Sequence, residues 1–246
     1  MEDSPAMEPR PGFQSTLWSV ILRAREGSAE ERQAALEKLC QIYWPPLYAY
    51  LIRKGQSRED ALDTVQGFFA YFIEKALMDR ADPDRGRFRN YILTVLENWL
   101  ASEYRKARAE KRGGGRAPLS FDFGTAGAEE HVDPPDKEVP EDAFNRSWAL
   151  TVLRRAQDLL RREFESRDLG AHYLAICSHL SGEPDRPSYE ELSKRLGCSV
   201  GEVNALLYSA RRRLRDLVRS VLRETVESES EVEQEVKDLF RFLLKK

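Results

Sequence analysis

The chain has 246 residues, enough for one or two domains, and 41 % of them are hydrophobic, so a packed core is expected. Charged residues make up 33 %, above the roughly 25 % of an average domain, which favours exposed amphipathic helices over buried sheets. The net charge of −3 alone argues against a nucleic-acid-binding protein, but positive and negative residues are segregated along the chain. The three cysteines lie far apart, which indicates neither a disulfide framework nor a zinc site, so we expect no metal and no cofactor.

The first residues show no targeting signal. Residues 1–12 are polar and rich in proline, and they predict a disordered N-terminus without the apolar run of a signal peptide. No window approaches the ~18 consecutive apolar residues of a membrane span. The expected location is therefore the cytoplasm, with no membrane as a partner.

Helical periodicity dominates the first half of the chain, and strand signals are nearly absent. Helices are expected over three early segments, namely 16–26, 30–43 and 46–54. Pro45 and Pro46 are expected to separate the last two, because proline lacks the amide hydrogen that continues a helix. Ser57, with Asp60 three residues later, predicts an N-cap before the next helix. Apolar residues then recur at three- and four-residue steps in two stripes, Ala61, Val65, Phe68, Phe69, Phe72 and Ile73 in one, and Phe88, Ile92, Val95 and Trp99 in the other.

Composition divides the chain into two helical domains. The first covers residues 13–112 and ends before the helix-breaking run Gly113–Gly115. Residues 113–143 predict a flexible acidic linker, because residues 117–142 contain four prolines and many acidic residues against Lys137 as the only lysine or arginine. The second domain covers residues 144–226, and a C-terminal extension follows over 227–246, acidic at first and amphipathic afterwards. The apolar stripe expected in this extension is Val236, Leu239, Phe240, Leu243 and Leu244.

Basic residues gather at the ends of the two domains. The first cluster is Arg105, Lys106, Arg108, Lys111 and Arg112, and the second is Arg211, Arg212, Arg213, Arg215, Arg219 and Arg223. Two basic helix ends joined by an acidic linker are typical of a protein that touches DNA at two places. The alternative is a pair of solvated helix faces, since arginine near a helix C-terminus also interacts favourably with the helix dipole.

The segment 188–207 predicts two helices around a tight turn. Ser188 and Glu191 form a capping-box pattern, Gly197 permits the turn, and Ser199 can cap the second helix. The candidate DNA contacts of this second helix are Ser199, Glu202, Asn204, Ala205, Tyr208, Arg211 and Arg212. Such a face can enter the major groove, where asparagine reads adenine and arginine reads guanine or holds phosphate. The alternative is a helical hairpin that packs and binds nothing. The sequence predicts an all-α protein whose second domain is a helix–turn–helix domain.

These motifs carry a resemblance to a known family. The segment 189–217 resembles region 4 of sigma-70-family factors, a helix–turn–helix followed by an arginine-rich extension. The run 57–69 resembles the hallmark of region 2 in that family, Glu-Asp-Ala followed by Asp-x-x-Gln-(Glu/Asp)-x-Phe. In the family this surface docks on the coiled coil of the polymerase clamp. The resemblance implies that Asp60, Asp63 and Gln66 bind core polymerase, whereas Phe69 faces inward; an ordinary solvated face is the alternative for the polar residues.

The segment 86–112 resembles the helix pair with which the family opens and reads the −10 element. Asn98 and Arg105 match an Asn-x-x-x-Asp-x-x-Arg pattern, in which Ser102 stands at the position of the aspartate. The −10 contacts that the resemblance implies are Asn98, Ser102, Tyr104, Arg105, Lys106, Arg108, Lys111 and Arg112. Tyr104 is the candidate for stacking on an unpaired base, at ~1–3 kcal/mol, whereas Trp99 continues the apolar stripe and is expected in the core.

In this order, the motifs are similar to a subgroup of extracytoplasmic-function (ECF) sigma factors that carry a short C-terminal extension. The resemblance implies a sigma factor that binds core RNA polymerase and promoter DNA and directs −10/−35 recognition and transcription initiation. It implies no enzymatic activity, and an anti-sigma factor or other regulator is a further candidate partner. Three alternatives remain: a helix–turn–helix regulator acting without polymerase docking, a metal-dependent nuclease, and a scaffold without promoter activity. The extension itself is expected to pack on the second domain, to dock a regulator, or to cover the first domain near Arg105 to Arg112.

Overall fold

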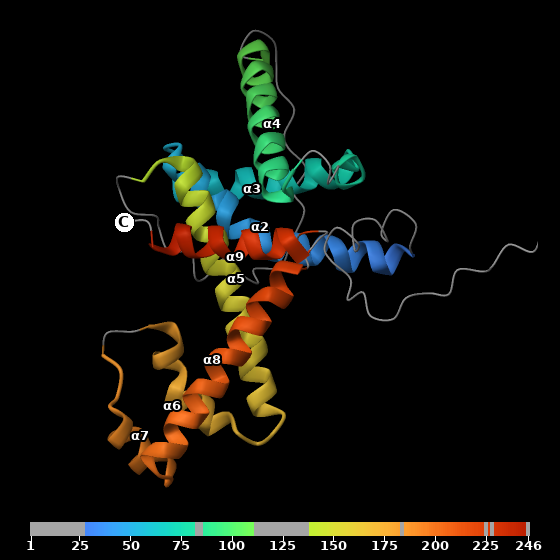
Figure 1. Ribbon diagram of the computed structural model, residues 1–246. Coiled ribbons are helices and arrows are strands. Elements are labelled where there is room, and N and C mark those ends of the chain that lie inside the picture. The colour runs from blue at the N-terminus through green and yellow to red at the C-terminus, as the bar shows by residue number, and fades with distance from the viewer. Residues whose placement is uncertain are drawn as a thin grey trace, which may run out of the picture.

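The computed structural model describes residues 28–81, 86–110, 138–182, 185–223, 226 and 229–244 (Figure 1). Across these residues it contains α-helices, one short 3-10 helix and no strand, so the predicted all-α class is confirmed. The elements are α2 (Ala29–Arg53), α3 (Arg58–Glu74), η1 (Leu77–Arg80), α4 (Phe88–Glu110), α5 (Pro140–Glu165), α6 (Gly170–Ser181), α7 (Tyr189–Leu196), α8 (Val200–Arg223) and α9 (Glu229–Leu244). The predicted disordered N-terminus, the helix expected over 16–26 and most of the predicted linker lie outside the described residues. None of the described helices is both long enough and apolar enough to cross a membrane.

Helix α2 runs without a break through Pro45 and Pro46, so the prediction that these prolines separate two helices is wrong. A proline in a helix interior removes one backbone hydrogen bond and crowds the preceding turn, at a cost of about 3 kcal/mol. Burial offsets this cost, because Tyr43, Leu47 and Leu51 are almost fully enclosed and α2 packs along α3 and α5. The packing of the whole helix overrides the local preference of two residues.

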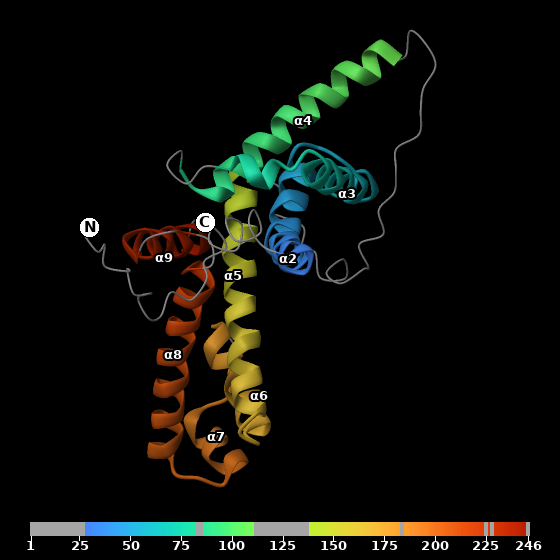
Figure 2. The same ribbon diagram turned by 90° about the vertical axis from the view of Figure 1, so that its right-hand side faces the viewer.

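Helices α3 and α4 follow the predicted periodicity. Ser57 caps α3, since its hydroxyl oxygen accepts the backbone N–H of Asp60 at 3.1 Å. The buried face of α3 consists of five residues of the predicted stripe, Ala61, Val65, Phe68, Phe69 and Phe72. The first half of α4 joins this core through Phe88 and Ile92. Its second half projects away from the rest of the described chain (Figures 1 and 2).

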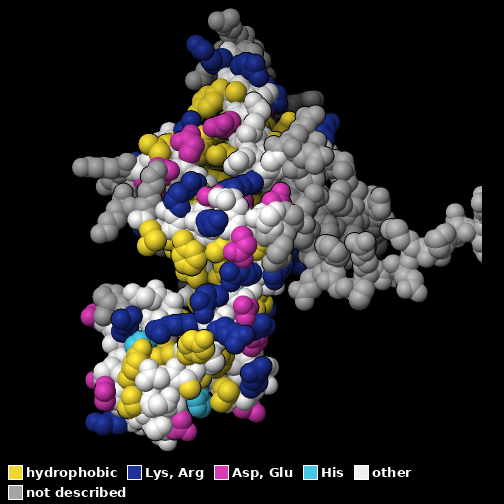
Figure 3. All heavy atoms as spheres, in the orientation of Figure 1, with side chains coloured by type: hydrophobic (Ala, Val, Ile, Leu, Met, Phe, Trp, Pro, Cys, Tyr) yellow, Lys and Arg dark blue, Asp and Glu magenta, His cyan; other side chains and the backbone are white. Residues whose placement is uncertain are grey.

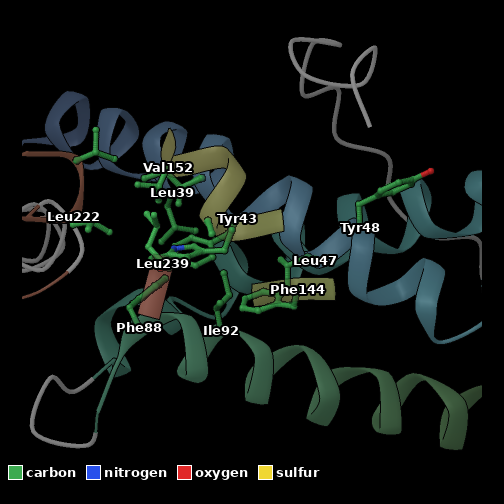
Figure 4. Packing of buried hydrophobic residues seen from close by; sticks show 14 of the residues in the cluster. Leu39, Tyr43, Leu47, Tyr48, Phe88, Ile92, Phe144, Val152, Leu222 and Leu239 are labelled. Carbon is green, nitrogen blue, oxygen red and sulfur yellow. The ribbon is translucent and has the colours of Figure 1, made fainter. Parts of the chain in front are cut away.

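Helix α5 begins at Pro140, before the predicted domain start, so the last residues of the predicted linker are helical. Proline suits this first helical position, where the missing N–H has no partner within the helix. The helix packs along both α2 and α8. Its side chains Phe144 and Val152 join Leu39 and Tyr43 of α2 in the main hydrophobic cluster (Figure 4). This cluster therefore contains residues from both sides of the predicted linker.

A second, smaller hydrophobic cluster lies at the end of the molecule opposite α3 and α4 (Figures 1 and 2). It is formed by α6, α7 and the first half of α8, and its buried members are Ala175, Ile176, Leu192, Val203, Leu207 and Ala210. The four from α7 and α8 lie on the sides of these helices that face each other and α6. The two helices of the segment 188–207 thus have a small core of their own.

Helix α9 packs on α5 and α8 with a face that matches the predicted stripe in part, since Leu239 is buried and Val236 and Leu243 pack against the main cluster. Its buried apolar side chains are Val232, Leu239 and Phe242. Phe240 and Leu244 are 51 % and 76 % exposed, so their assignment to the buried stripe is wrong. The buried face also contains the carboxylates of Glu235 and Asp238, which a pattern of apolar residues does not reveal.

Candidate nucleic-acid interface

A three-residue turn separates α7 from α8, and both helices begin with a side-chain cap. At α7, the Ser188 hydroxyl oxygen accepts the N–H of Glu191 at 3.2 Å, and the Glu191 carboxylate accepts the N–H of Ser188 at 2.7 Å. Gly197 ends α7 with φ of +65°, a left-handed conformation that glycine adopts without strain. Glu202 and Ser199 exchange equivalent bonds at 3.2 and 2.8 Å at the start of α8. The predicted caps and turn are confirmed.

The second cap changes the interpretation of Glu202, which the sequence places among the DNA contacts. Its carboxylate accepts the backbone N–H of Ser199 at 2.8 Å and the Ser199 hydroxyl at 2.7 Å. These hydrogen bonds hold the pKa of Glu202 below its ordinary value, because they favour the charged form. The Glu202 side chain is exposed, but its carboxylate already accepts hydrogen bonds at the start of its own helix. Glu202 is therefore part of the cap of α8.

The remaining candidate contacts of α8 lie on one exposed side of the helix, because steps of three and four residues bring side chains to the same side. We call this set the α8 face, and its members are Asn204, Ala205, Tyr208, Arg211 and Arg212. Tyr208 at its centre is 67 % exposed. The Asn204 amide nitrogen donates to the carbonyl of Val200 at 3.1 Å, so this side chain lies back along the first turn.

The arginines of the second basic cluster divide into two groups that the sequence does not separate. Arg213 donates from two nitrogens to the carboxylate of Glu163 on α5, at 2.8 and 2.5 Å. Arg219 donates to Glu233 on α9 at 2.9 Å. Arg213 follows Arg212 by one residue and is therefore turned by about 100° around the helix, away from the α8 face. Arg213 and Arg219 hold helices together, while the arginines of the α8 face point to solvent.

A second candidate surface lies on the projecting half of α4. Its described members, which we call the α4 surface, are Asn98, Ser102, Tyr104, Arg105, Lys106 and Arg108. Ser102 is half-buried and the others are exposed, Tyr104 at 67 %. Lys106 pairs with Glu103 at 2.7 Å, an exposed pair of the kind that contributes little to stability. Figure 3 shows Lys and Arg side chains at the end of this projection and a separate group near α8. Lys111 and Arg112 lie outside the described residues.

Trp99 and Tyr104, the two aromatic residues in the second half of α4, take the different places that the sequence predicts. Trp99 packs against Phe68 and Tyr71 of α3, with ring centroids 5.8 and 6.1 Å apart. Tyr104 extends into solvent one and a half turns further along the helix. Only Tyr104 is therefore accessible to a base.

The predicted polymerase-docking residues lie on the polar side of α3. Asp60 and Asp63 are exposed and Gln66 is half-buried, while Phe69 faces the core as predicted. The Asp60 carboxylate also accepts the hydroxyl of Ser57 at 2.7 Å, so it takes part in the cap of its own helix. We call Asp60, Asp63 and Gln66 the α3 surface. Contact between α3 and α4 places it at the same end of the molecule as the α4 surface, opposite the α8 face (Figures 1 and 2).

The described residues contain no group of three or more His, Cys, Asp and Glu side chains that could hold a metal ion. Cys40, Cys177 and Cys198 are free thiols. Burial, with a smaller contribution from the charge of Glu37, raises the pKa of Cys40 to about 12, so this thiol stays protonated and unreactive at neutral pH.

No protein-family model matches the chain, and no curated protein and no solved structure is significantly similar to it. Function is therefore inferred from the sequence motifs and the three exposed surfaces together.

Proposed function

We propose that the protein is a sigma factor of the ECF type, a specificity subunit that binds core RNA polymerase and directs −10/−35 promoter recognition and transcription initiation. The observation that carries this proposal is the presence of three exposed surfaces on one chain, in the order of the family's motifs. They are the α3 surface, the α4 surface and the α8 face. A sigma factor needs all three, one for polymerase and two for DNA.

The α8 face supports a role in binding the −35 element in the major groove. Arg211 and Arg212 are exposed and lie beside Tyr208 on one side of a firmly capped helix. Exposed arginines in this position bind phosphates, whereas side chains nearer the start of the helix read base edges. Arg213 is taken up by Glu163 and has no part in this contact.

The α4 surface supports a role at the −10 element. An exposed tyrosine among basic residues suits a single strand, because a base can stack on the ring while arginines neutralise phosphates. Tyr104, Arg105 and Arg108 provide this combination on a helix that projects from the core (Figure 2). A base that leaves the duplex exchanges its stacking partners there for contacts with protein.

The α3 surface supports the assignment to a polymerase subunit over an independent DNA-binding regulator. A regulator acting on a palindrome would use the α8 face and would leave Asp63 and Gln66 without a role. Acidic and polar side chains on an exposed helix provide charge complementarity for docking on a larger assembly. Such a subunit would act in the bacterial cytoplasm.

The test is transcription in vitro with purified bacterial core RNA polymerase and a library of promoter fragments. The proposal predicts transcripts only when the protein is present, from templates that share two separate sequence elements. Replacement of both Asp63 and Gln66 by alanine serves as the matched variant, and it should reduce these transcripts without loss of helicity. Specific DNA binding without polymerase-dependent transcription would indicate a regulator, and the absence of both activities would refute the proposal.

A further inference from the structure

The start of α4 and the C-terminal helix α9 meet in a cluster of charged side chains, of which Arg89, Glu235 and Asp238 are buried and Arg87 is half-buried. Arg89, which is 5 % exposed, donates to Glu235 at 2.7 Å and to Asp238 at 2.9 Å. Arg87 pairs with both carboxylates as well, and its Nε lies 3.1 Å from Glu235. These partners are 146 to 151 residues apart, so the contact joins distant segments of the chain.

Aromatic rings from α5 and α9 flank the Arg89 guanidinium. Its central carbon lies 4.7 Å from the ring centroid of Trp148 on α5 and 5.2 Å from that of Phe242 on α9. The two rings contact each other edge to face, with centroids 6.4 Å apart. A cation held over ring faces is stabilised by their quadrupoles, the more so when water is excluded. Arg89 therefore ties α4 to α5 and α9 at one point.

Helix α9 is also fixed to α8. Glu233 accepts the guanidinium of Arg219 at 2.9 Å, and Val232 is buried in the main cluster together with Leu222 of α8. One short helix thus touches the helix that holds the α4 surface, the helix that holds the α8 face, and α5 between them (Figure 2).

This contact leaves the proposed binding surfaces uncovered. Asp63 on α3, Tyr104 on α4, and Tyr208 and Arg212 on α8 are all exposed with α9 in place. Glu235 and Asp238 of α9 meet Arg87 and Arg89, and Glu233 meets Arg219. The sequence suggests instead that the acidic part could lie near the basic end of α4. Helix α9 therefore does not cover the proposed binding surfaces. Its contacts instead affect where these surfaces lie relative to one another.

We propose that α9 is a brace that holds the α4 surface at a fixed position relative to the α8 face, with Arg89 as the positioning residue at its centre. This inference rests on the proposed function, because it concerns the two DNA contacts. According to this inference, the C-terminal extension sets the distance between the −10 and −35 elements that the protein accepts.

The length of α4 explains why this contact controls spacing. From Arg89 to Arg108 the helix rises by about 28 Å, at 1.5 Å per residue. A tilt of about 10° at Arg89 would therefore move Arg108 by about 5 Å, more than the ~3.4 Å between successive base pairs. Only the first half of α4 lies in the core, so the anchoring of this half decides where the projecting half points.

The charges make the brace sensitive to small changes. A buried arginine that loses its carboxylate partners is left with an uncompensated charge, which expels it towards water. Helix α9 has 16 residues and is marginal in water when it does not pack on other elements. Neutral replacements of the same shape, Glu235→Gln with Asp238→Asn, should therefore release α9 and leave in place the smaller cluster and the part of the main cluster that other helices form.

The first experiment measures the brace without DNA. Labels attached through genetically encoded residues at Ala101 on α4 and Ser209 on α8 report the distance distribution between the two helices in the full-length protein. We expect one narrow distribution for the unchanged chain and for the control Lys237→Gln, which removes an exposed charge from the same helix. The double variant Glu235→Gln/Asp238→Asn should give a broad one. Removal of residues 229–246 is the second variant, in case the double variant does not fold. A broad distribution for the unchanged chain, or an unchanged one for both variants, would overturn the proposal.

The second experiment measures spacing on DNA. The promoter obtained from the library is lengthened and shortened by one and two base pairs between its two elements, and transcription is compared. For the unchanged chain we expect a loss of at least about tenfold off the best spacing, the scale of a lost base contact. The variants should lose activity at the best spacing and become nearly indifferent to length. Equal spacing profiles for the variants and the unchanged chain would contradict the brace. So would a gain of activity of the variants at every spacing, which is expected if α9 is autoinhibitory. Absence of all promoter activity would refute the proposed function, while the distance measurement would still decide on the brace.

Discussion

The two ends of α4 contain the same type of residue in opposite roles. Arg89 near its start is 5 % exposed and is enclosed by two carboxylates and two aromatic rings. Arg105 near its end is exposed on the projecting half of the helix. The difference arises in the surroundings and not in the local sequence, since one end of the helix meets α5 and α9 and the other extends beyond the core. An arginine therefore becomes part of the fold or part of an interface according to what packs against it.

Replacing each arginine in turn tests whether the two ends of α4 differ in this way. Arg89→Ala removes the buried partner of Glu235 and Asp238, which keep only their pairs with the more exposed Arg87 and, for Asp238, Arg241. We expect a loss of about 3 kcal/mol in the free energy of unfolding. Arg105→Ala removes an exposed side chain and should change this quantity by less than about 0.5 kcal/mol. Urea denaturation followed by circular dichroism measures both. Equal effects of the two substitutions would show that Arg89 is not part of the fold.

The same contrast applies to the acidic residues. Asp238 is buried with arginines, whereas Asp63 lies exposed on α3 beside the half-buried Gln66. We expect Asp63→Ala with Gln66→Ala to weaken the affinity for core polymerase by about tenfold, equal to about 1.4 kcal/mol, and to leave helicity intact. Pull-down and titration with labelled core enzyme measure this affinity. Undiminished binding by the double variant would remove α3 from the docking surface.

Arg212 and Arg213 are neighbours on α8 and provide the same contrast between an arginine of an interface and an arginine of the fold. Arg212→Ala should lower the slope of log affinity against log salt by about one unit, because one phosphate contact is lost. Arg213→Ala should leave this slope unchanged and cost up to about 1 kcal/mol of stability, since it breaks an exposed ion pair with Glu163. DNA binding over a salt series, with an unfolding curve for each variant, separates the two effects. A reduced slope for Arg213→Ala alone would reverse the assignment of the two residues.

The smallest effect concerns the cap of α8. Ser199→Ala should cost about 1 kcal/mol of stability at neutral pH. The pKa of Glu202 is lowered by its hydrogen bonds to Ser199, so the stability that this carboxylate contributes is present above its ordinary pKa of 4.5 and is lost as the pH falls through the lowered value. The variant should therefore lose less stability than the unchanged chain on acidification. Thermal unfolding at several pH values measures this, and an identical pH dependence would show that the Ser199 hydroxyl does not contribute to the lowered pKa, which the backbone N–H of this residue also lowers.

Local patterns predict the local structure of this protein well. The caps at Ser57, Ser188 and Ser199, the turn at Gly197 and the inward stripe of α3 all follow from residues close together in the sequence. The separate places of Trp99 and Tyr104 are predicted as well, because helical periodicity alone distinguishes them. These features are decided within a few turns of helix, where propensity and spacing act.

Features that depend on distant segments are not predicted. Pro45 and Pro46 stay in one helix because packing against α5 outweighs their local cost. The buried face of α9 contains Glu235 and Asp238, and nothing near them in the sequence shows that Arg87 and Arg89 neutralise them. Counting only apolar residues therefore selects Phe240 and Leu244, which are exposed.

As the proposed sigma factor, the chain would open promoter DNA together with polymerase. Reactivity of unpaired thymines towards permanganate on a promoter from the library tests this most directly. We expect reactive thymines at the −10 element only when core polymerase and the protein are both present, and weaker reactivity when Tyr104 is replaced by alanine. Thymines that stay protected with both components present, or that become equally reactive with core polymerase alone, would contradict it.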